Sequence, residues 1–414
     1  MLNTARGAEA ETEGGLTVNL RIVMRVCAAL VPASLVVGCA APGATSNTNE
    51  LPFEQAVAVA TDGLIKQTQK LPGFLAKMEA KVAKKDLLVD PMLDASSGQQ
   101  TGITRQLEQL VSNRLRENWA QVDVVPFQAG NLAKAQYLLT GTTRRVQSDK
   151  PVRAFTINLA ITDLKTGKVV AQSSARSSDK GLDATPTAYY RDSPVLVKDK
   201  VVDGYIRTSE TSPGTGADPG YLEKLAAAPL ISEATSAYNN EHYQESLTLY
   251  NSAASAPGGE QIRVSNGIYL ANWRLGKTAE AEEAFGKVVA LGIANQTLGV
   301  KFLFNPGTTD FWTDPRVSGP YGFWLRQIAR QAAVAKACMN VVGHTSKTGS
   351  EAINDRLSRQ RATYIKERLE KESGELAGRL KSSGVGFHEN IVGTGTDDVR
   401  DALDRRVEFK VSGC

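Results

Sequence analysis

The sequence predicts an α/β protein with several domains, and three observations carry this prediction. The chain has 414 residues, more than one ordinary domain holds. Segments with the 3.6-residue periodicity of amphipathic helices alternate with short apolar runs of strand length. Residues 181–220 are rich in proline and glycine, and they interrupt this pattern as a connection between domains would.

Composition argues against several functional classes. Hydrophobic residues make up 42% and charged residues 22% of the chain, as in ordinary globular proteins. A formal net charge of +4, without a basic run, argues against nucleic-acid binding. The cysteines and histidines form no CxxC or HExxH spacing, and no Ser-His-Asp or Cys-His set is visible. We therefore predict no metal, no cofactor and no enzymatic activity, although a pair of catalytic carboxylates cannot be recognised at this level. The lack of a run of membrane strands argues against a porin.

The N-terminal segment has the pattern of a secretion signal. Basic residues precede an apolar stretch at 27–38, which suits a signal core and is too short to span a bilayer. Its end, Leu35-Val-Val-Gly-Cys39, resembles the lipobox of bacterial lipoproteins. The resemblance implies a signal peptide at 1–38, lipidation (palmitate) of Cys39, and a tether at 39–52; the alternative is a signal peptide with a chance cysteine.

Two features refine this interpretation. Residue 40 is alanine, which by the sorting rule of such lipoproteins implies the outer membrane and its periplasmic face. Several acyl chains would hold the protein there stably, whereas one chain binds only marginally. Residues 1–17 are polar and acidic, unlike the start of a signal peptide, so we expect translation to begin downstream, at Met24.

Residues 53–180 are predicted to form one mixed α/β domain. Helical periodicity covers 53–71 and 103–119, and a short apolar run at 86–93 lies between them. Four strands are then predicted at 122–127, 137–146, 155–164 and 169–177, the last two joined by a Lys165-Thr-Gly-Lys168 turn.

This front domain resembles the periplasmic domains of LpoB-type penicillin-binding-protein activators, FlgO and the curli-secretion lipoprotein CsgG. The resemblance rests on three short segments: Leu88-Val-Asp90, the strand Tyr137-Leu-Leu-Thr-Gly-Thr142, and a hairpin with Asp163-Leu-x-Thr-Gly-Lys168 at its tip. It implies a domain that binds an unknown envelope protein.

A linker is predicted at 181–220, most clearly from 208 to 220, although interleaved tyrosines suggest that part of it packs on a neighbour. The following residues 221–297 are helical in pattern. A loose repeat places Tyr250 and Phe285 at equivalent positions, 35 residues apart. This segment resembles a tetratricopeptide (TPR) pair; the alternative is a plain helical hairpin. Such a short array needs support from flanking domains.

Residues 298–414 contain a series of short segments with recognisable patterns. They are 300–304 with 306–311 as first strand and turn, 321–337 as helix, 339–345 with the Gly343-His344-Thr345 turn, the NxxLSxxRA pattern from Asn354 to Ala362, 384–386 to 393–395 as third strand region, and Arg405-Arg406-Val407-Glu408 opening the last strand. In this order the segments resemble the OmpA C-terminal domain family. The resemblance implies a βαβαββ fold and a partner, because the family binds the diaminopimelate stem of peptidoglycan without cutting it.

The family's ligand site implies six binding residues here: Thr345, Ser346, Asn354, Leu357, Arg361 and Arg406. The arginine that grips the ligand carboxylate corresponds to Arg361, whose guanidinium can donate two parallel hydrogen bonds. The family aspartate that pairs with the ligand's ammonium is replaced by Ser346. Either binding is weaker, or Glu351 or Asp355 substitutes, or the ligand differs. A second departure is Asp404, where the family usually has asparagine.

Cys338 precedes the second strand and Cys414 ends the last one. The family topology implies that these strands are neighbours, so we predict a disulfide in the oxidising periplasm. The alternative is two free thiols.

The sequence thus predicts an outer-membrane lipoprotein that docks on peptidoglycan and acts as a tether or scaffold. The alternative is an activator or assembly factor for an envelope machine, such as a peptidoglycan synthase or a flagellar or secretion complex, with weak or lost peptidoglycan binding.

Overall fold

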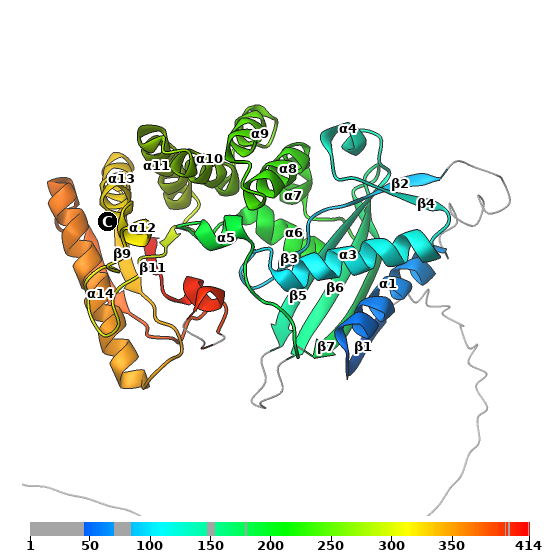
Figure 1. Cartoon of the computed structure of the whole chain (residues 1–414), viewed down its shortest axis with the longest axis horizontal. Coiled ribbons are helices and arrows are strands. Elements are labelled where there is room, and N and C mark those ends of the chain that lie inside the picture. The colour runs from blue at the N-terminus through cyan, green and yellow to red at the C-terminus, as the bar shows by residue number, and fades with distance from the viewer. Residues whose placement is uncertain are drawn as a thin grey trace, which may run out of the picture. The chain divides into compact units, whose positions relative to one another are not determined.

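The computed structural model describes residues 45–69, 84–146, 154–178, 180–393, 395, 398–412 and 414 (Figure 1). The predicted signal peptide, Cys27 and the predicted lipidation site Cys39 lie outside these residues. Within the described part, none of the helices combines the length and the apolar character needed to cross a membrane.

The first part of the described chain forms a seven-stranded mixed sheet in the order β1-β7-β6-β5-β2-β4, with β3 beside β5. The long strands β5, β6 and β7 pair antiparallel, whereas β1, β2 and β4 join in parallel. All four strands predicted after residue 121 are present. The elements are β1 (Thr45–Leu51), α1 (Phe53–Gln69), β2 (Lys85–Val89), β3 (Leu93–Asp94), α3 (Gly102–Asn118), β4 (Val122–Val125), α4 (Ala129–Leu132), β5 (Tyr137–Val146), β6 (Ala154–Asp163) and β7 (Lys168–Ser178).

Strand β1 corrects the predicted tether at 39–52. Its residues pair in parallel with β7, from Thr45 opposite Ser173 to Leu51 opposite Ser177, with a register shift between Asn47 and Glu50. The short polar sequence gives no apolar alternation, so only the free edge of β7 provides the hydrogen-bond partners that make it a strand.

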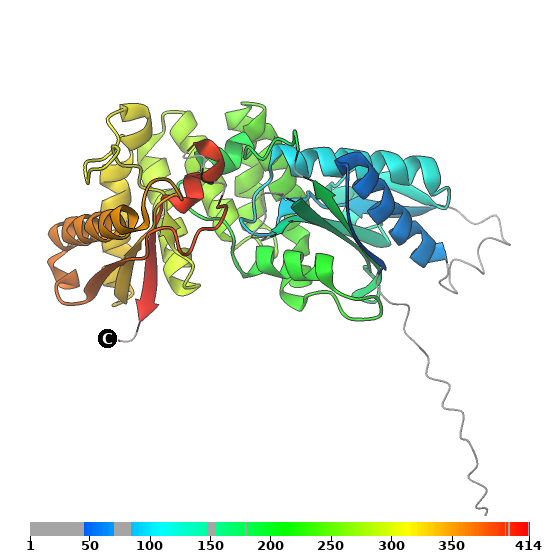
Figure 2. The same ribbon diagram turned by 90° about the horizontal axis from the view of Figure 1, so that it is seen from below.

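Both faces of this sheet are covered (Figure 2). Neighbouring strand residues point to opposite faces, and they divide between two cores accordingly. Leu87 and Leu139 pack with α1 and α3 on one face, whereas Leu88 and Leu138 pack on the other face with Val202, Tyr205 and Ile206.

The predicted linker at 181–220 is instead part of the fold. It contains α5 (Ala188–Asp192), α6 (Lys200–Glu210) and α7 (Pro219–Glu223). The Tyr205 hydroxyl of α6 accepts a hydrogen bond from Gly141 N at 2.9 Å and donates to Gly141 O at 3.0 Å in the centre of the sheet. The aromatic residues between the prolines and glycines are buried: Tyr205 packs on the sheet, whereas Tyr189 and Tyr190 belong to the core that contains the helical hairpins.

Two helical hairpins follow. They consist of α8 (Ala228–Asn239) with α9 (Tyr243–Ser255), and α10 (Ile262–Arg274) with α11 (Thr278–Ala294). Their turns share a left-handed residue at equivalent positions, Glu241 with φ 64° and Gly276 with φ 73°, which are 35 residues apart. The internal repeat therefore extends to the backbone of the turns, and the assignment to the TPR class stays a prediction.

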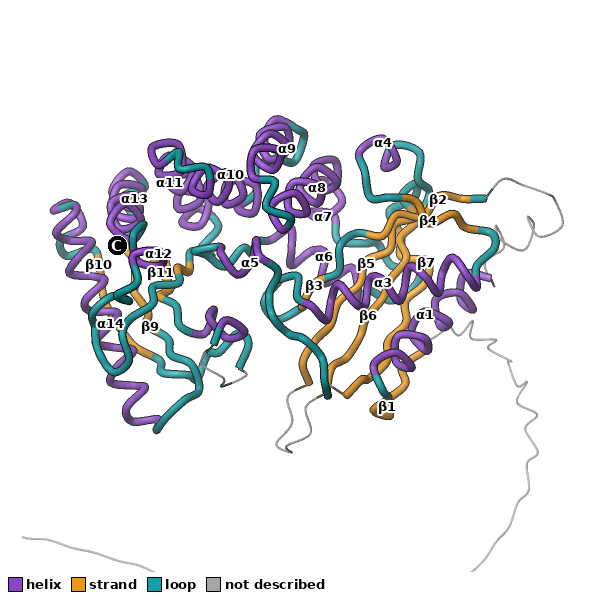
Figure 3. Tube along the Cα trace, viewed as in Figure 1, coloured by secondary structure: helices purple, strands orange, loops and turns teal. Residues whose placement is uncertain are grey.

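The last part is a four-stranded sheet in the order β10-β9-β11-β8, in which β10 and β9 are parallel and the other pairs antiparallel. Figure 3 shows its strands in orange beside the helices α13 and α14. The chain order is βαβαββ, as predicted. The elements are β8 (Gly299–Val300), α12 (Pro315–Ser318), α13 (Tyr321–Val334), β9 (Cys338–Gly343), α14 (Glu351–Glu372), β10 (Leu380–Gly384), the 3-10 helix η3 (Val399–Asp404) and β11 (Val407–Ser412).

Two predicted strands differ in extent. The first strand was expected at 300–304, but β8 ends at Val300 because Phe302 and Phe304 turn into an aromatic cluster with Phe311, at ring-centroid distances of 5.7 and 5.3 Å. The third strand, expected from 384 onward, lies earlier, at 380–384. The loop at 391–393 is held instead by the Asp404 carboxylate.

The helical hairpins and the C-terminal sheet share one hydrophobic core. Phe285 of α11 stacks on Trp324 of α13 at 5.5 Å, and the Trp324 indole N–H donates to the Tyr269 hydroxyl of α10 at 3.2 Å. The hairpins are therefore supported by the flanking domain.

Candidate functional site

A cavity of about 520 Å³ opens between β9, β11, α14 and the 302–312 loop. It is lined by all six residues that the family resemblance implies: Thr345, Ser346, Asn354, Leu357, Arg361 and Arg406. The structure therefore brings together residues that are up to 61 positions apart in the sequence. Their contact with a ligand stays a prediction.

Two glycines position helix α14 over this cavity. Gly343 of β9 lies opposite Gly384 of β10, and α14 crosses both. A Cβ on Gly343 would lie 2.1 Å from the Ser358 carbonyl oxygen, and one on Gly384 would lie 2.2 Å from Arg359 N. Any other residue would push the helix outward, so the glycine of the Gly-His-Thr turn sets the depth at which the α14 side chains meet the cavity.

Arg361 is held at the cavity wall by the loop that precedes α12. Its Nε donates to Thr308 O at 3.1 Å and its Nη2 to Asn305 O at 3.2 Å. Its guanidinium lies over the Phe304 ring, 4.8 Å from the centroid. The side chain is 92% buried. These contacts orient the guanidinium plane before a ligand arrives, which reduces the entropy lost on binding.

Asn354, Thr345 and Ser346 also line the cavity. The Asn354 amide donates to Thr348 O at 2.7 Å and Ser350 O at 3.1 Å, so it closes the turn that leads into α14. The Ser346 hydroxyl lies 3.3 Å from that of Thr348. The buried Thr345 hydroxyl has no hydrogen-bond partner among the described residues. A ligand atom entering the cavity could satisfy it.

Arg406 lines the cavity, but its hydrogen bonds are to other residues of the domain. Its Nε and Nη2 donate to Glu408 Oε1 at 2.8 and 2.6 Å, and it also donates to Leu403 O and Glu389 O. Burial alone would raise the pKa of Glu408, but the contacts with His344 and Arg406 outweigh it and lower the pKa to about 2. Arg406 thus lines the cavity as one half of a buried ion pair.

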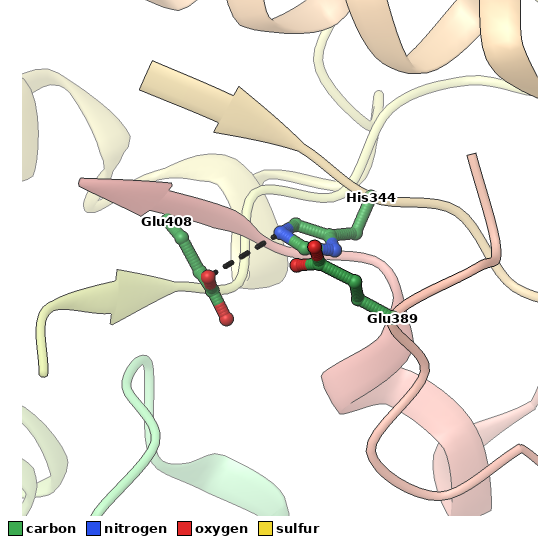
Figure 4. A group of neighbouring side chains, drawn as sticks. All are labelled: His344, Glu389 and Glu408. Carbon is green, nitrogen blue, oxygen red and sulfur yellow. Dashed lines mark ion pairs between the residues drawn. The ribbon is translucent and has the colours of Figure 1, made fainter. Parts of the chain in front are cut away.

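His344 completes this network behind the cavity (Figure 4). Its Nε2 lies 3.6 Å from Glu408 Oε2, and burial lowers the pKa of the imidazole, so His344 is neutral at pH 7. Glu389 lies beside them, and the three groups have ligand atoms within 4.8 Å of one another. Arg406 and Lys410 already compensate the two carboxylates, Lys410 at 3.0 Å from Glu389. The group therefore acts as an ion-pair network, with little negative charge left to attract a cation.

The acids near the cavity differ from those considered from sequence. Glu351 and Asp355 lie at 3.2 and 3.7 Å from His388 and do not line the cavity, because the first turns of α14 direct them away from it. Among the described lining residues the one carboxylate is Asp398, which pairs with Arg400 through both oxygens. No signal in the sequence marked Asp398.

Asp404, the other departure from the family pattern, has a structural role. Its fully buried carboxylate accepts hydrogen bonds from Ile391 N, Val392 N and Gly393 N at 2.7 to 2.9 Å. A carboxylate forms stronger hydrogen bonds with backbone N–H groups than an amide does. Aspartate in place of the family's asparagine therefore stabilises the loop at 391–393.

The structure joins Cys338 and Cys414 in a disulfide, with their Cα atoms 5.3 Å apart. The bond ties the start of β9 to the residue that follows β11, its neighbour in the sheet. It therefore closes the end of the sheet away from the cavity.

The cavity rim contains two exposed apolar side chains that sequence patterns did not mark. Trp312 is 39% exposed and Ile353 is 52% exposed, and both line the cavity. Most large apolar residues elsewhere in the described chain are buried, so this pairing at one opening is typical of a binding surface.

Comparison with known proteins supports the same assignment for this part of the chain. The model of the OmpA family matches residues 304–403. This range contains α13, β9, α14 and most of the cavity, and the chain therefore carries an OmpA-like domain at its C-terminus.

Two curated relatives match over similar lengths. Outer membrane protein A of Shimwellia blattae is 37% identical over 81 residues, which is 18% of this chain and 33% of that protein. Outer membrane porin F of Pseudomonas aeruginosa is 37% identical over 71 residues, 17% of this chain and 20% of that protein. The chain thus spans a third or less of the curated relatives that it matches.

Solved structures similar to this chain include the peptidoglycan-associated lipoprotein from Burkholderia pseudomallei, at 19% identity, with 28% of this chain and 89% of that chain covered and a TM-score of 0.23. A putative MotB-like protein from Desulfovibrio vulgaris is 19% identical, with 34% and 96% covered and a TM-score of 0.24.

Proposed function

We propose that this protein is a lipid-anchored protein of the bacterial outer membrane that docks non-covalently on peptidoglycan through its OmpA-like domain. The observation that carries the proposal is the cavity on which all six expected binding residues converge. The protein would then act as a periplasmic tether or scaffold, and the front domain would recruit an envelope protein.

The chemistry of the cavity suits a peptide stem that ends in a zwitterionic diamino acid. Arg361 presents a planar guanidinium, which can donate two parallel hydrogen bonds to a carboxylate. Thr345 and Ser346 offer hydroxyls, and Asp398 offers a carboxylate on the lining. Trp312 at the rim can stack on the face of a sugar ring of the glycan strand.

Ser346 predicts that this docking is weak. A carboxylate at that position would form a charge-assisted hydrogen bond with the ligand's ammonium, which contributes about 1.5–3 kcal/mol. Restoring it with Ser346→Asp should strengthen binding by about ten- to a hundredfold. A ligand without an ammonium group would instead bind more weakly to this variant.

The test is co-sedimentation of the whole chain, kept unlipidated by Cys39→Ser, with purified sacculi that contain diaminopimelate. Arg361→Ala is compared with Arg359→Ala, which removes an exposed arginine from the same helix. Loss of pelleting in the first variant only, and competition by a free diaminopimelate-containing stem peptide, would support the proposal.

Wild-type protein that stays in the supernatant would refute peptidoglycan docking. The second candidate, an assembly factor or synthase activator that works through its front domain, would then be favoured, since Ser346 already removes one family contact. Mass spectrometry of the native N-terminus tests the anchor: an acylated Cys39 supports it, and an unmodified or absent Cys39 refutes it.

A further inference from the structure

A second cavity, also of about 520 Å³, lies where the helical hairpins meet the OmpA-like domain. Its lining residues come from α5, α8, α10, α12, α13, η3 and the residues after β8; Figure 1 labels these helices, η3 excepted. It shares Leu303 and Arg405 with the first cavity, but most of its lining lies outside the ligand motifs of the OmpA-like domain.

Lys301 is the distinctive group of this cavity. Its side chain is 91% buried, and its ammonium donates to Arg191 O at 3.0 Å and Tyr190 O at 3.4 Å. Within the described part of the chain, no carboxylate lies within 4 Å of its Nζ. A buried ammonium with neutral partners alone is costly, and it is retained in proteins where it has a use.

The other charges of the cavity favour an anion. Five basic and two acidic side chains line it in the described part, an excess of three positive charges. The two acids are already paired: Asp192 contacts Arg274 and Arg191, and Asp314 forms a fork with Arg316. The basic residues are Arg191, Arg274, Lys301, Arg316 and Arg405.

Aromatic side chains supply both an apolar floor and further donors. The Tyr321 hydroxyl accepts from Leu303 N at 3.0 Å, and the Tyr269 hydroxyl accepts from the Trp324 indole at 3.2 Å. Among the described residues neither hydroxyl donates its own proton to an acceptor, and burial raises the pKa of Tyr321 to about 12, so the proton is retained. Each can donate to a ligand oxygen.

We propose that this cavity binds an organic carboxylate that carries an aromatic or large apolar group, with the carboxylate at Lys301 and the apolar group on the aromatic floor. The volume lies in the range of small-ligand pockets. Two sources share this chemistry: a small aromatic acid, and the C-terminal residue of a peptide. The site does not depend on peptidoglycan docking.

The test is isothermal titration of the unlipidated full chain with four probes: N-acetylphenylalanine, an acetylated tripeptide ending in phenylalanine, and the C-terminal amide of each. Both carboxylates should bind, and the amides should bind about tenfold more weakly or not at all. Tighter binding of the tripeptide identifies a peptide end as the occupant, and tighter binding of the single residue identifies a small acid.

Two variants locate the site, and a third serves as control. Lys301→Met removes the ammonium, and Val317→Trp fills the cavity from α12 and leaves the ammonium in the chain. Both should lose carboxylate binding about tenfold or more, whereas Lys287→Met, on the exposed face of α11, should not. None of the three positions lines the first cavity, so all three variants should still sediment with sacculi if the wild type does.

The proposal is overturned if no probe binds at millimolar concentration, if amides bind as tightly as acids, or if folded Val317→Trp protein keeps wild-type affinity. Circular dichroism of each variant establishes that a loss of binding is not a loss of folding.

Discussion

Replacing Arg406 with methionine should destabilise the OmpA-like domain more than it affects any ligand contact. The Arg406 side chain is 4% exposed, and two of its nitrogens donate to Glu408 Oε1 at 2.8 and 2.6 Å. Arg406→Met leaves the mostly buried Glu408 carboxylate without its closest cation and leaves two backbone carbonyls without a donor. Removing one partner of a buried ion pair costs about 3–5 kcal/mol.

The double variant Arg406→Met, Glu408→Leu should recover much of this loss, because it removes both charges and fills the space with apolar atoms. Urea denaturation followed by fluorescence, at pH 7, of the wild type, the two single variants Arg406→Met and Glu408→Leu, and the double variant measures four free energies of unfolding and so gives the coupling. A coupling free energy near zero would contradict the ion-pair role.

The pH dependence offers an independent measurement of the same pair. The pKa of Glu408 falls from 4.5 to about 2 in the folded protein, so the unfolded chain binds the proton more readily between these values. The stabilisation is present above pH 4.5 and is lost as the pH falls toward 2, and it amounts to at most about 3 kcal/mol.

This acid-dependent loss should be smaller in Glu408→Gln than in the wild type. If Arg406→Met keeps wild-type stability and an unchanged acid slope but no longer sediments with sacculi, then Arg406 is a ligand contact and the structural interpretation is refuted.

Three further changes test other parts of the fold. Tyr205→Phe leaves the Gly141 N–H and carbonyl without their hydrogen-bond partner inside the sheet. Urea denaturation should therefore show a free energy of unfolding about 1–3 kcal/mol lower. An unchanged value would mean that α6 does not pack there. Cys414→Ser opens a disulfide with a sequence separation of 76 and should cost about 4 kcal/mol in the chain-entropy model, which melting under reducing and non-reducing conditions would measure. Asp404→Ala removes three backbone hydrogen bonds from residues 391–393, so their amide hydrogens should exchange faster, and equal protection in the variant would rule out this anchoring role.

The sequence by itself determined the class of each part and most of its elements. Apolar alternation predicted β6, and helical periodicity predicted α1 and α3 to within two residues at each end. The OmpA-like motifs predicted the βαβαββ order, and all six residues predicted from them line the first cavity. These features are local: a repeat of apolar residues or a short motif encodes its own backbone conformation, so a sequence displays them directly.

Tertiary structure alone decided which segments are partners. Strand β1 and helix α6 fall in segments predicted as a tether and a linker, and both are ordered by partners more than 60 residues away, β7 and Gly141. Tertiary contacts also decide the roles of two basic residues. Arg406 forms a buried ion pair with Glu408, and the Lys301 ammonium is buried against a backbone carbonyl of α5. Burial, and the pairing of charges and backbone groups across the chain, depend on distances in space that the order of residues does not record.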